Sequence, residues 1–191
     1  MNSPASLAIF ASGNGTNAEN ICKFFASRNE IITRRIYCNR DDAFVLERAK
    51  RLEVDHLVFS KSEFQQPRFL SELADIDYIV LAGFLLLIPN YLVKAFSGRI
   101  INIHPSLLPK FGGKGMFGDH VHKAVLANGE KESGITVHEV NENYDEGAII
   151  LQEKCVVKPT DSVETLAKRV HQLEYDFYPK TIESFIKGKM L

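Results

Sequence analysis

The stretch Tyr78-Ile79-Val80-Leu81-Ala82 decides the fold class of this chain. It is strongly β-like and almost uninterrupted in apolarity, which is typical of a central strand covered on both faces. Outward from it, short apolar runs predict further strands over 6–12, 34–38, 54–59 and 99–104. Helical spacing predicts helices between them, over 18–27, 42–52, 65–75 and 121–128. Strands that alternate with helices indicate an α/β protein with a mostly parallel twisted sheet and helices on both faces.

The pattern changes in the last third of the chain. Strands are predicted over 134–140 and 148–157, and the connection between them is too short for a helical crossover. We therefore expect an antiparallel strand pair at one edge of the sheet. A last helix is predicted over 161–187, divided or kinked at Pro179. No repeat, low-complexity tract or linker interrupts the chain, so residues 1–191 are expected to form a single domain.

Helix caps can also be predicted, because short polar side chains favour the N-cap position. Asn17 is the expected N-cap of the first helix, Asp41 or Asp42 of the second, and Asp161 or Ser162 of the last.

The composition is that of an ordinary globular protein, with 191 residues, 45% of them apolar and 25% charged. A formal net charge of −1 gives no general affinity for nucleic acid or acidic membranes. The N-terminus lacks a signal-peptide pattern, and no apolar run approaches the roughly 20 residues that a membrane span needs. Three cysteines without a CxxC spacing indicate reduced thiols. We expect a cytoplasmic protein with small-molecule partners, bound to neither nucleic acid nor membrane.

A glycine loop, Gly13-Asn14-Gly15-Thr16-Asn17-Ala18, follows the first predicted strand and opens the first helix. Its backbone N–H groups and the helix N-terminus would suit a phosphate, and the Thr16 and Asn17 side chains could add hydrogen bonds. The string also satisfies G-x-G-x-x-A, a dinucleotide-binding form, with Asp41 or Asp42 near the place of the acidic partner. A plain tight turn is the third interpretation, and the motif alone leaves all three open.

The polar pair Asn102 and His104 ends the strand predicted over 99–104, and two prolines follow it closely. Residues two apart in a strand point to the same side. An amide and an imidazole aimed at one point could stabilise an oxyanion and move a proton. Asp145, in the acidic loop before Gly147, is the candidate carboxylate that would raise the pKa of His104. A structural histidine and a solvated acidic turn are the alternatives.

Two other chemistries are not indicated. No G-x-S-x-G elbow occurs, and no cysteine stands at a helix start beside a basic residue, so a covalent intermediate is not expected. His120 and His122 are two residues apart and would face apart on a helix, so we expect no metal. His138, inside a predicted strand, is interpreted as structural.

These motifs, in this order and over nearly the whole chain, resemble the folate-dependent formyltransferases. The short chain and the glycine loop resemble their phosphoribosylglycinamide formyltransferase (glycinamide ribonucleotide transformylase) branch. The resemblance rests on Ser12-Gly13-Asn14-Gly15-Thr16-Asn17, Leu81-Ala82-Gly83-Phe84, Asn102-Ile103-His104-Pro105-Ser106-Leu107-Leu108-Pro109, Gly134-Ile135-Thr136-Val137-His138 and Tyr144-Asp145-Glu146-Gly147.

The resemblance implies a Rossmann-like formyltransferase fold and a reaction of purine biosynthesis. In it the amine of glycinamide ribonucleotide attacks the formyl carbon of the cosubstrate 10-formyltetrahydrofolate, with no metal. Asn102 and protonated His104 would stabilise the oxyanion, and Asp145 would raise the His104 pKa. By the same resemblance Gly15, Thr16, Asn17 and Glu174 would bind the substrate phosphate and ribose. The folate would contact Leu85, Leu86, Leu87, Ile88, Asn102 and Arg68. The protein would act as a monomer or weak homodimer.

Three residues depart from the family pattern. Leu86 stands where many members carry Arg, His171 where Gln is common, and Glu146 where Gly is usual, directly beside Asp145. An extra carboxylate there could raise the pKa of its neighbours. The glycine-rich stretch 111–118 is longer than in many members and suggests a mobile flap over the site.

Rival functions differ in their acceptor or in their chemistry. A formyltetrahydrofolate hydrolase would share the Asn, His and Asp, with water in place of the amine. A methionyl-tRNA formyltransferase would normally carry a further domain and a basic surface. A non-catalytic nucleotide-binding module would have no use for the three polar residues. A dinucleotide-dependent oxidoreductase would need a substrate domain, for which 191 residues leave little room.

Overall fold

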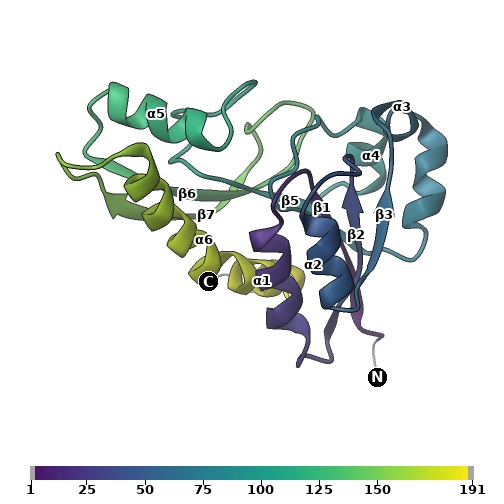
Figure 1. Cartoon of the computed structure of the whole chain (residues 1–191). Coiled ribbons are helices and arrows are strands. Elements are labelled where there is room, and N and C mark those ends of the chain that lie inside the picture. Colours follow the sequence, from purple (N-terminus) through teal and green to yellow (C-terminus); the bar gives the residue numbers. More distant parts are fainter. Residues whose placement is uncertain (1–2, 189–191) are drawn as a thin grey trace.

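The computed structural model describes residues 3–188 and shows one seven-stranded sheet with helices on both faces (Figure 1). The strand order is β3-β2-β1-β4-β5-β6-β7. The strands are β1 (Ala5–Ala11), β2 (Ile31–Cys38), β3 (Asp55–Val58), β4 (Tyr78–Leu81), β5 (Ile100–His104), β6 (Glu132–Glu139) and β7 (Ile149–Val156). The first five pair in parallel, whereas β6 pairs antiparallel with both β5 and β7. The mostly parallel sheet and the antiparallel pair at one edge are confirmed.

The helices form two layers, as the alternating pattern predicts. They are α1 (Thr16–Phe25), α2 (Val45–Arg51), α3 (Lys61–Phe64), the 3-10 helix η1 (Pro67–Leu73), α4 (Asn90–Ala95), α5 (Asp119–Ala127) and α6 (Val163–Ile186). Leu7 and Ile9 of β1 face the layer of α1, α2, α5 and α6. Ala8 and Phe10 face the layer of α3, η1 and α4, where aromatic rings fill the core. This alternation explains why both faces of the central strands are apolar.

Several local predictions were wrong. The segment predicted as a helix over 65–75 forms the 3-10 helix η1, which begins at Pro67, and the short helix α3 ends just before that segment. The helix α4 was not predicted, because it is only six residues long, which is too short for a helical period to be recognised. Neither Asp41 nor Asp42 caps α2, since Phe44 occupies the N-cap position and Asp42 pairs with Arg40 instead. Gly15, not Asn17, is the N-cap of α1.

The last helix is confirmed, with Ser162 as its N-cap, but Pro179 does not divide it. A proline inside a helix leaves the carbonyl four residues earlier without its usual donor. That carbonyl belongs to Tyr175, and the side-chain amide of Asn20 on α1 donates a hydrogen bond to it at 3.0 Å. A neighbouring helix therefore satisfies the group that Pro179 leaves unpaired. The expected single domain over 1–191 stays a prediction.

Candidate active site

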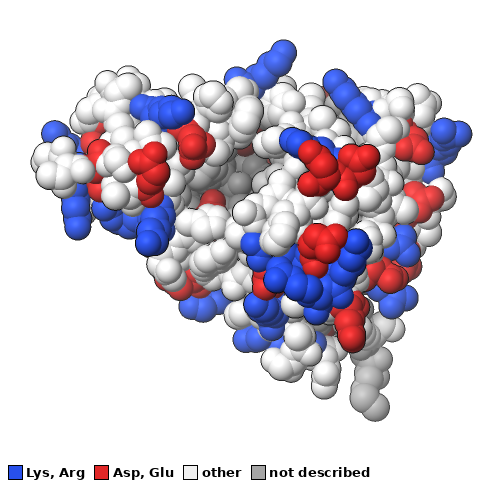
Figure 2. Space-filling view, viewed as in Figure 1, with Lys and Arg blue, Asp and Glu red and all other residues white. Residues whose placement is uncertain are grey.

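A cavity of about 820 Å³ opens at the carboxyl ends of β1, β4 and β5. Open parallel sheets bind ligands at this edge, where the strand order reverses. Figure 2 shows the surface hollowed between the end of the molecule that carries α5 and the side that carries α1 and α2. The lining comes from the glycine loop, the segment 81–88, the end of β5, the segment 113–119, the β6–β7 loop and α6. All the separate sequence motifs therefore meet in one cavity.

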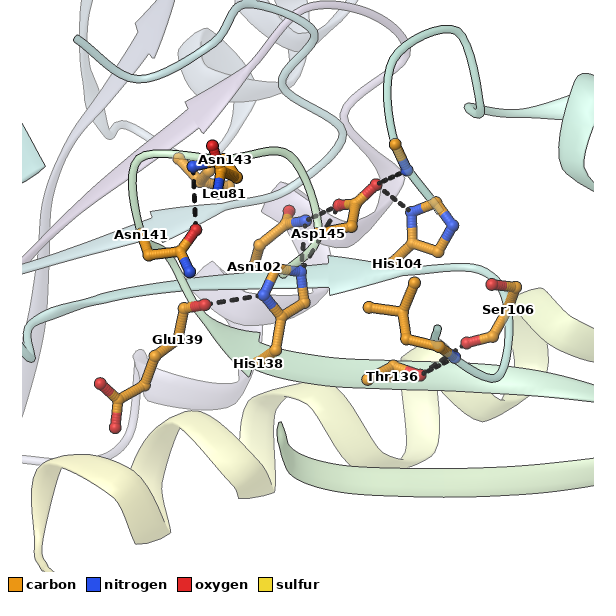
Figure 3. Close-up of polar contacts among 12 residues, drawn as sticks. Leu81, Asn102, His104, Ser106, Thr136, His138, Glu139, Asn141, Asn143 and Asp145 are labelled. Atoms are coloured by element: carbon orange, nitrogen blue, oxygen red, sulfur yellow. Dashed lines mark hydrogen bonds and ion pairs between the residues drawn. The ribbon is translucent and has the colours of Figure 1, made fainter. Parts of the chain in front are cut away.

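Asn102, His104 and Asp145 lie together in this cavity (Figure 3). Asn102 and His104 stand on β5, and Asp145 reaches them from the β6–β7 loop. Asp145 Oδ2 lies 3.5 Å from His104 Nδ1, and Asp145 Oδ1 lies 3.5 Å from Asn102 Nδ2. Asp145 has a φ of 57°, a left-handed conformation that is uncommon outside glycine and is held here by its surroundings. The arrangement joins an imidazole, an amide and a carboxylate around one point.

Two opposing effects act on the pKa of His104. Burial lowers the pKa of His104, and this outweighs the nearby Asp145 carboxylate and the Phe111 carbonyl, which both raise it. The side chain is only 5% exposed, so its charged form loses hydration. Asp145 therefore raises the pKa of His104, as expected, but the larger effect of burial was not predicted. His104 Nε2 donates to the Phe111 oxygen at 2.8 Å, so both ring nitrogens face acceptors, which suits the imidazolium.

Asp145 keeps its negative charge despite its burial. Desolvation raises its pKa, but the neighbouring His138 imidazole, the His104 charge and the Gly113 N–H together lower it below the usual range. The Gly113 N–H donates to Asp145 Oδ2 at 2.8 Å. A charged carboxylate is thus fixed beside His104, where it favours the imidazolium.

His138 belongs to this polar cluster, although the sequence indicated a structural residue. Its Nδ1 donates to the Glu139 carbonyl at 2.7 Å, so in the neutral ring Nε2 is an acceptor. Asn102 Nδ2 lies 3.1 Å from that Nε2 and donates to it, which fixes the orientation of the Asn102 amide. Asn102 and His138 are direct partners in the β5–β6 register. The sequence alone does not give the register of β5 against β6, so it could not place His138 beside Asn102.

Glu174 and His171 connect α6 to the glycine loop. His171 Nδ1 lies 2.7 Å from Glu174 Oε2, and His171 Nε2 lies 3.0 Å from Thr16 Oγ1. The Asn17 amide donates to Glu174 Oε2 at 2.8 Å, while Asn17 Oδ1 is buried without a partner among the described residues. The Glu174 hydrogen bond raises the pKa of His171. Four side chains therefore form one continuous polar network at this end of the cavity.

The opposite wall of the cavity is more apolar. Leu85, Leu86, Leu87 and Ile88 all line it, so the departure at Leu86 adds apolar surface. The Leu85 N–H donates to Ser12 Oγ at 3.0 Å, which ties this wall to the end of β1. Arg68 is exposed on η1 and does not line the cavity, because the 3-10 helix places it outside.

The remaining departure, Glu146, points away from the cluster. Its side chain is exposed and accepts a hydrogen bond from the Asn143 amide at 2.8 Å. It is not among the main causes of the pKa shifts of His104 and Asp145. That Glu146 raises the pKa of its neighbours stays a prediction, and the structure shows no hydrogen bond between its side chain and Asn102, His104 or Asp145.

The glycine-rich segment 111–118 touches the cluster through its backbone, at Phe111 and Gly113. That it acts as a mobile flap stays a prediction. His122 is buried in the cavity wall, where burial lowers its pKa, and His120 is exposed. Within residues 3–188, no group of three or more His, Cys, Asp or Glu side chains could hold a metal ion. No helix in the same range is long and apolar enough to cross a membrane.

The sheet topology and the cluster of Asn102, His104 and Asp145 at its carboxyl edge together define a class of protein. Comparison with known proteins identifies that class. The family model described as Formyl transferase matches residues 5–182, so the chain belongs to the formyl transferase family.

Individual members of this family are similar to the chain over most of its length. Chloroplastic phosphoribosylglycinamide formyltransferase of Arabidopsis thaliana is 42% identical over 96% of this chain, which spans 66% of that relative's length. The Haemophilus influenzae phosphoribosylglycinamide formyltransferase is 36% identical, over 96% of this chain and 88% of its own. The crystal structure of glycinamide ribonucleotide transformylase 1 from Symbiobacterium toebii superposes with a TM-score of 0.89 at 33% identity, covering 98% of this chain and 90% of its own.

Proposed function

We propose that this chain is a phosphoribosylglycinamide formyltransferase, which transfers the formyl group of 10-formyltetrahydrofolate to the amine of glycinamide ribonucleotide in purine biosynthesis. The observation that carries this function is the meeting of Asn102, His104 and Asp145 between a polar and an apolar end of one cavity. The names of the curated relatives support the same activity and the use of a formyl-folate.

The chemistry is a direct acyl transfer. The amine nitrogen forms a bond to the formyl carbon, and the carbonyl electron pair moves to oxygen. An Asn102 N–H and protonated His104 stabilise this oxyanion. The carbon–nitrogen bond to the folate then breaks, and the folate nitrogen leaves with a proton while the attacking nitrogen loses one. Asp145 favours the charged His104 and so opposes the effect of burial on its pKa.

This mechanism requires a change at the start of the glycine-rich segment. One ring nitrogen of His104 faces Asp145, and the other donates to the Phe111 carbonyl. The second nitrogen is the one left to serve the oxyanion, so the Phe111 carbonyl must give up its hydrogen bond when the formyl group binds. A flap formed by residues 111–118 would make that exchange possible.

The two ends of the cavity suit the two substrates. Gly15, Thr16 and Asn17 would hold the substrate phosphate, with Glu174 near the ribose. The apolar wall at 85–88, together with Asn102, would hold the folate, and Arg68 could reach it only from outside the cavity. A volume of about 820 Å³ is in the range of small-molecule sites. We further propose that the protein acts in the cytoplasm on these small molecules, without a metal, and as a monomer or weak homodimer.

Measurement of formyl release with and without the amine substrate tests the function. We expect loss of the formyl group from 10-formyltetrahydrofolate only when glycinamide ribonucleotide is present, with formylated product formed in equal amount. Release of formate at the same rate without the amine would identify a hydrolase instead and would refute the proposed function.

Substitution of Thr16 by Val or Asn17 by Ala tests the phosphate end. Each removes a side-chain hydrogen-bonding group, so the KM for the phosphorylated amine should rise about tenfold. The KM for the folate and kcat should change little, because the catalytic cluster is untouched. Thr160→Val, at an exposed position before α6, is the matched control and should behave as the unmodified protein. A rise in the folate KM instead would show that the phosphate assignment is wrong.

A further inference from the structure

The helix α2 packs directly against the back of the glycine loop. The Val45 N–H, at the first residue of α2, donates to the Gly13 carbonyl at 3.1 Å. Gly15 lies so close to Val45 that an added Cβ would come within 2.4 Å of Val45 Cγ2. With a φ of 77°, Gly15 also has a backbone conformation that few other residues adopt. The backbone of the glycine loop is therefore packed tightly against the first turn of α2.

Arg48, one turn further along α2, binds the next residue of the loop twice. Its Nε donates to the Asn14 carbonyl at 2.8 Å, and its Nη2 donates to Asn14 Oδ1 at 2.6 Å. Its third donor, Nη1, pairs with Glu19 of α1. The Arg48 and Glu19 side chains are only 17% and 18% exposed, so their ion pair is partly shielded from water, whereas the two bonds to Asn14 lie at the surface. Each of the three guanidinium nitrogens therefore has a partner, and Arg48 does not line the cavity.

These contacts decide which way the loop N–H groups point. Across a trans peptide bond, the C=O and the following N–H point in opposite directions. Because Val45 and Arg48 hold the Gly13 and Asn14 carbonyls toward α2, the N–H groups of Asn14 and Gly15 are directed away from it. Neither N–H has an acceptor among residues 3–188, and both residues line the cavity. Two successive N–H groups turned to one side form an anion-binding nest.

We propose that Arg48 is a positioning residue that orients the Asn14 and Gly15 N–H groups toward the substrate phosphate without touching it. This inference rests on the proposed function, because it takes the phosphate of the amine substrate as the anion. It assigns a role to a basic side chain whose charge is directed at the loop carbonyls and at Glu19 rather than at the ligand.

The neighbouring Arg51 provides a matched control. It lies on the same helix, its guanidinium is 5.6 Å from the Phe44 ring, and its Nη2 is 4.0 Å from Glu19 Oε2. The corresponding distance from Arg48 to the Phe44 ring is 5.0 Å. Figure 2 shows Lys and Arg side chains gathered over α1 and α2 with acidic ones among them. Arg48→Met and Arg51→Met therefore remove the same charge from the same patch, but only the first removes the bonds to the loop.

The experiment measures steady-state kinetics and the binding of inorganic phosphate by calorimetry for the two variants. For Arg48→Met we expect the KM for the phosphorylated amine and the Kd for phosphate to rise about tenfold, with kcat and the folate KM unchanged. Arg48→Lys, which keeps the charge but can make fewer of the bonds, should lie between. Arg51→Met should match the unmodified protein. Glu19→Gln should also match it, because it removes the ion pair and leaves the Asn14 bonds in place.

Each outcome separates this inference from the proposed function. Equal phosphate affinity in Arg48→Met and Arg51→Met would overturn the inference, whatever the activity of the unmodified protein. If Arg48→Met does not fold, an Arg48→Lys variant with unchanged phosphate Kd overturns it in the same way. If the unmodified protein shows no formyl transfer but its phosphate binding depends on Arg48, the proposed function fails and the role of Arg48 stands.

Discussion

Replacement of His104 by alanine is expected to lower kcat for formyl transfer about 10³-fold, because the change removes both a proton donor and an oxyanion partner. The KM values for both substrates should stay within a few-fold, since the glycine loop and the apolar wall are untouched. His104 is almost fully buried, and its two nitrogens face Asp145 and the Phe111 carbonyl, so the change also removes both of these contacts.

The measurement needs a histidine control and a folding check. His56→Ala, at an exposed position on β3, removes an imidazole far from the cavity and should leave kcat unchanged. Circular dichroism and the Tm of the His104 variant would show that the fold survives. Turnover of the His104→Ala protein close to that of the His56→Ala protein would contradict the mechanism.

Replacement of Asp145 by asparagine is expected to have the second largest effect, lowering kcat about 10²-fold by removing the charge that supports the imidazolium. The sign of the accompanying pH shift follows from the His104 pKa. Burial already lowers that pKa and Asp145 opposes the change, so loss of the carboxylate lowers it further. Because protonated His104 is the active form, activity falls as the pH rises through its pKa. The falling limb of the pH–kcat profile should therefore move to lower pH.

Glu146→Gln is the matched control for this prediction, since it removes the adjacent carboxylate without touching the cluster. Its kcat and pH profile should equal those of the unmodified protein. An Asp145→Asn profile with its falling limb in the original position would mean that the carboxylate does not set the charge of His104. A shift in the Glu146→Gln profile would mean that the exposed loop carboxylate acts on the site after all.

Local sequence pattern was sufficient for the sheet and for the motifs. A run of apolar residues such as Tyr78–Ala82 has only one stable place, between two helical layers, so the parallel α/β fold follows from it. The glycine loop and the pair Asn102 and His104 could be found because the geometry of each depends on a few consecutive residues. Short or irregular elements such as α4 and η1 could not, because tertiary packing stabilises them more than their own sequence does.

The sequence by itself therefore determined the order of the strands and of the longer helices, the glycine loop after the first strand, and the residue types available for proton transfer. Only the tertiary structure decided the charge balance of His104, the place of His138 beside Asn102, and the contact of Arg48 with the glycine loop. The physical reason is the distance along the chain over which each kind of interaction acts. Backbone preference and periodicity act over a few residues, whereas desolvation, ion pairing and hydrogen bonds between elements depend on which distant segments the fold brings within a few ångströms.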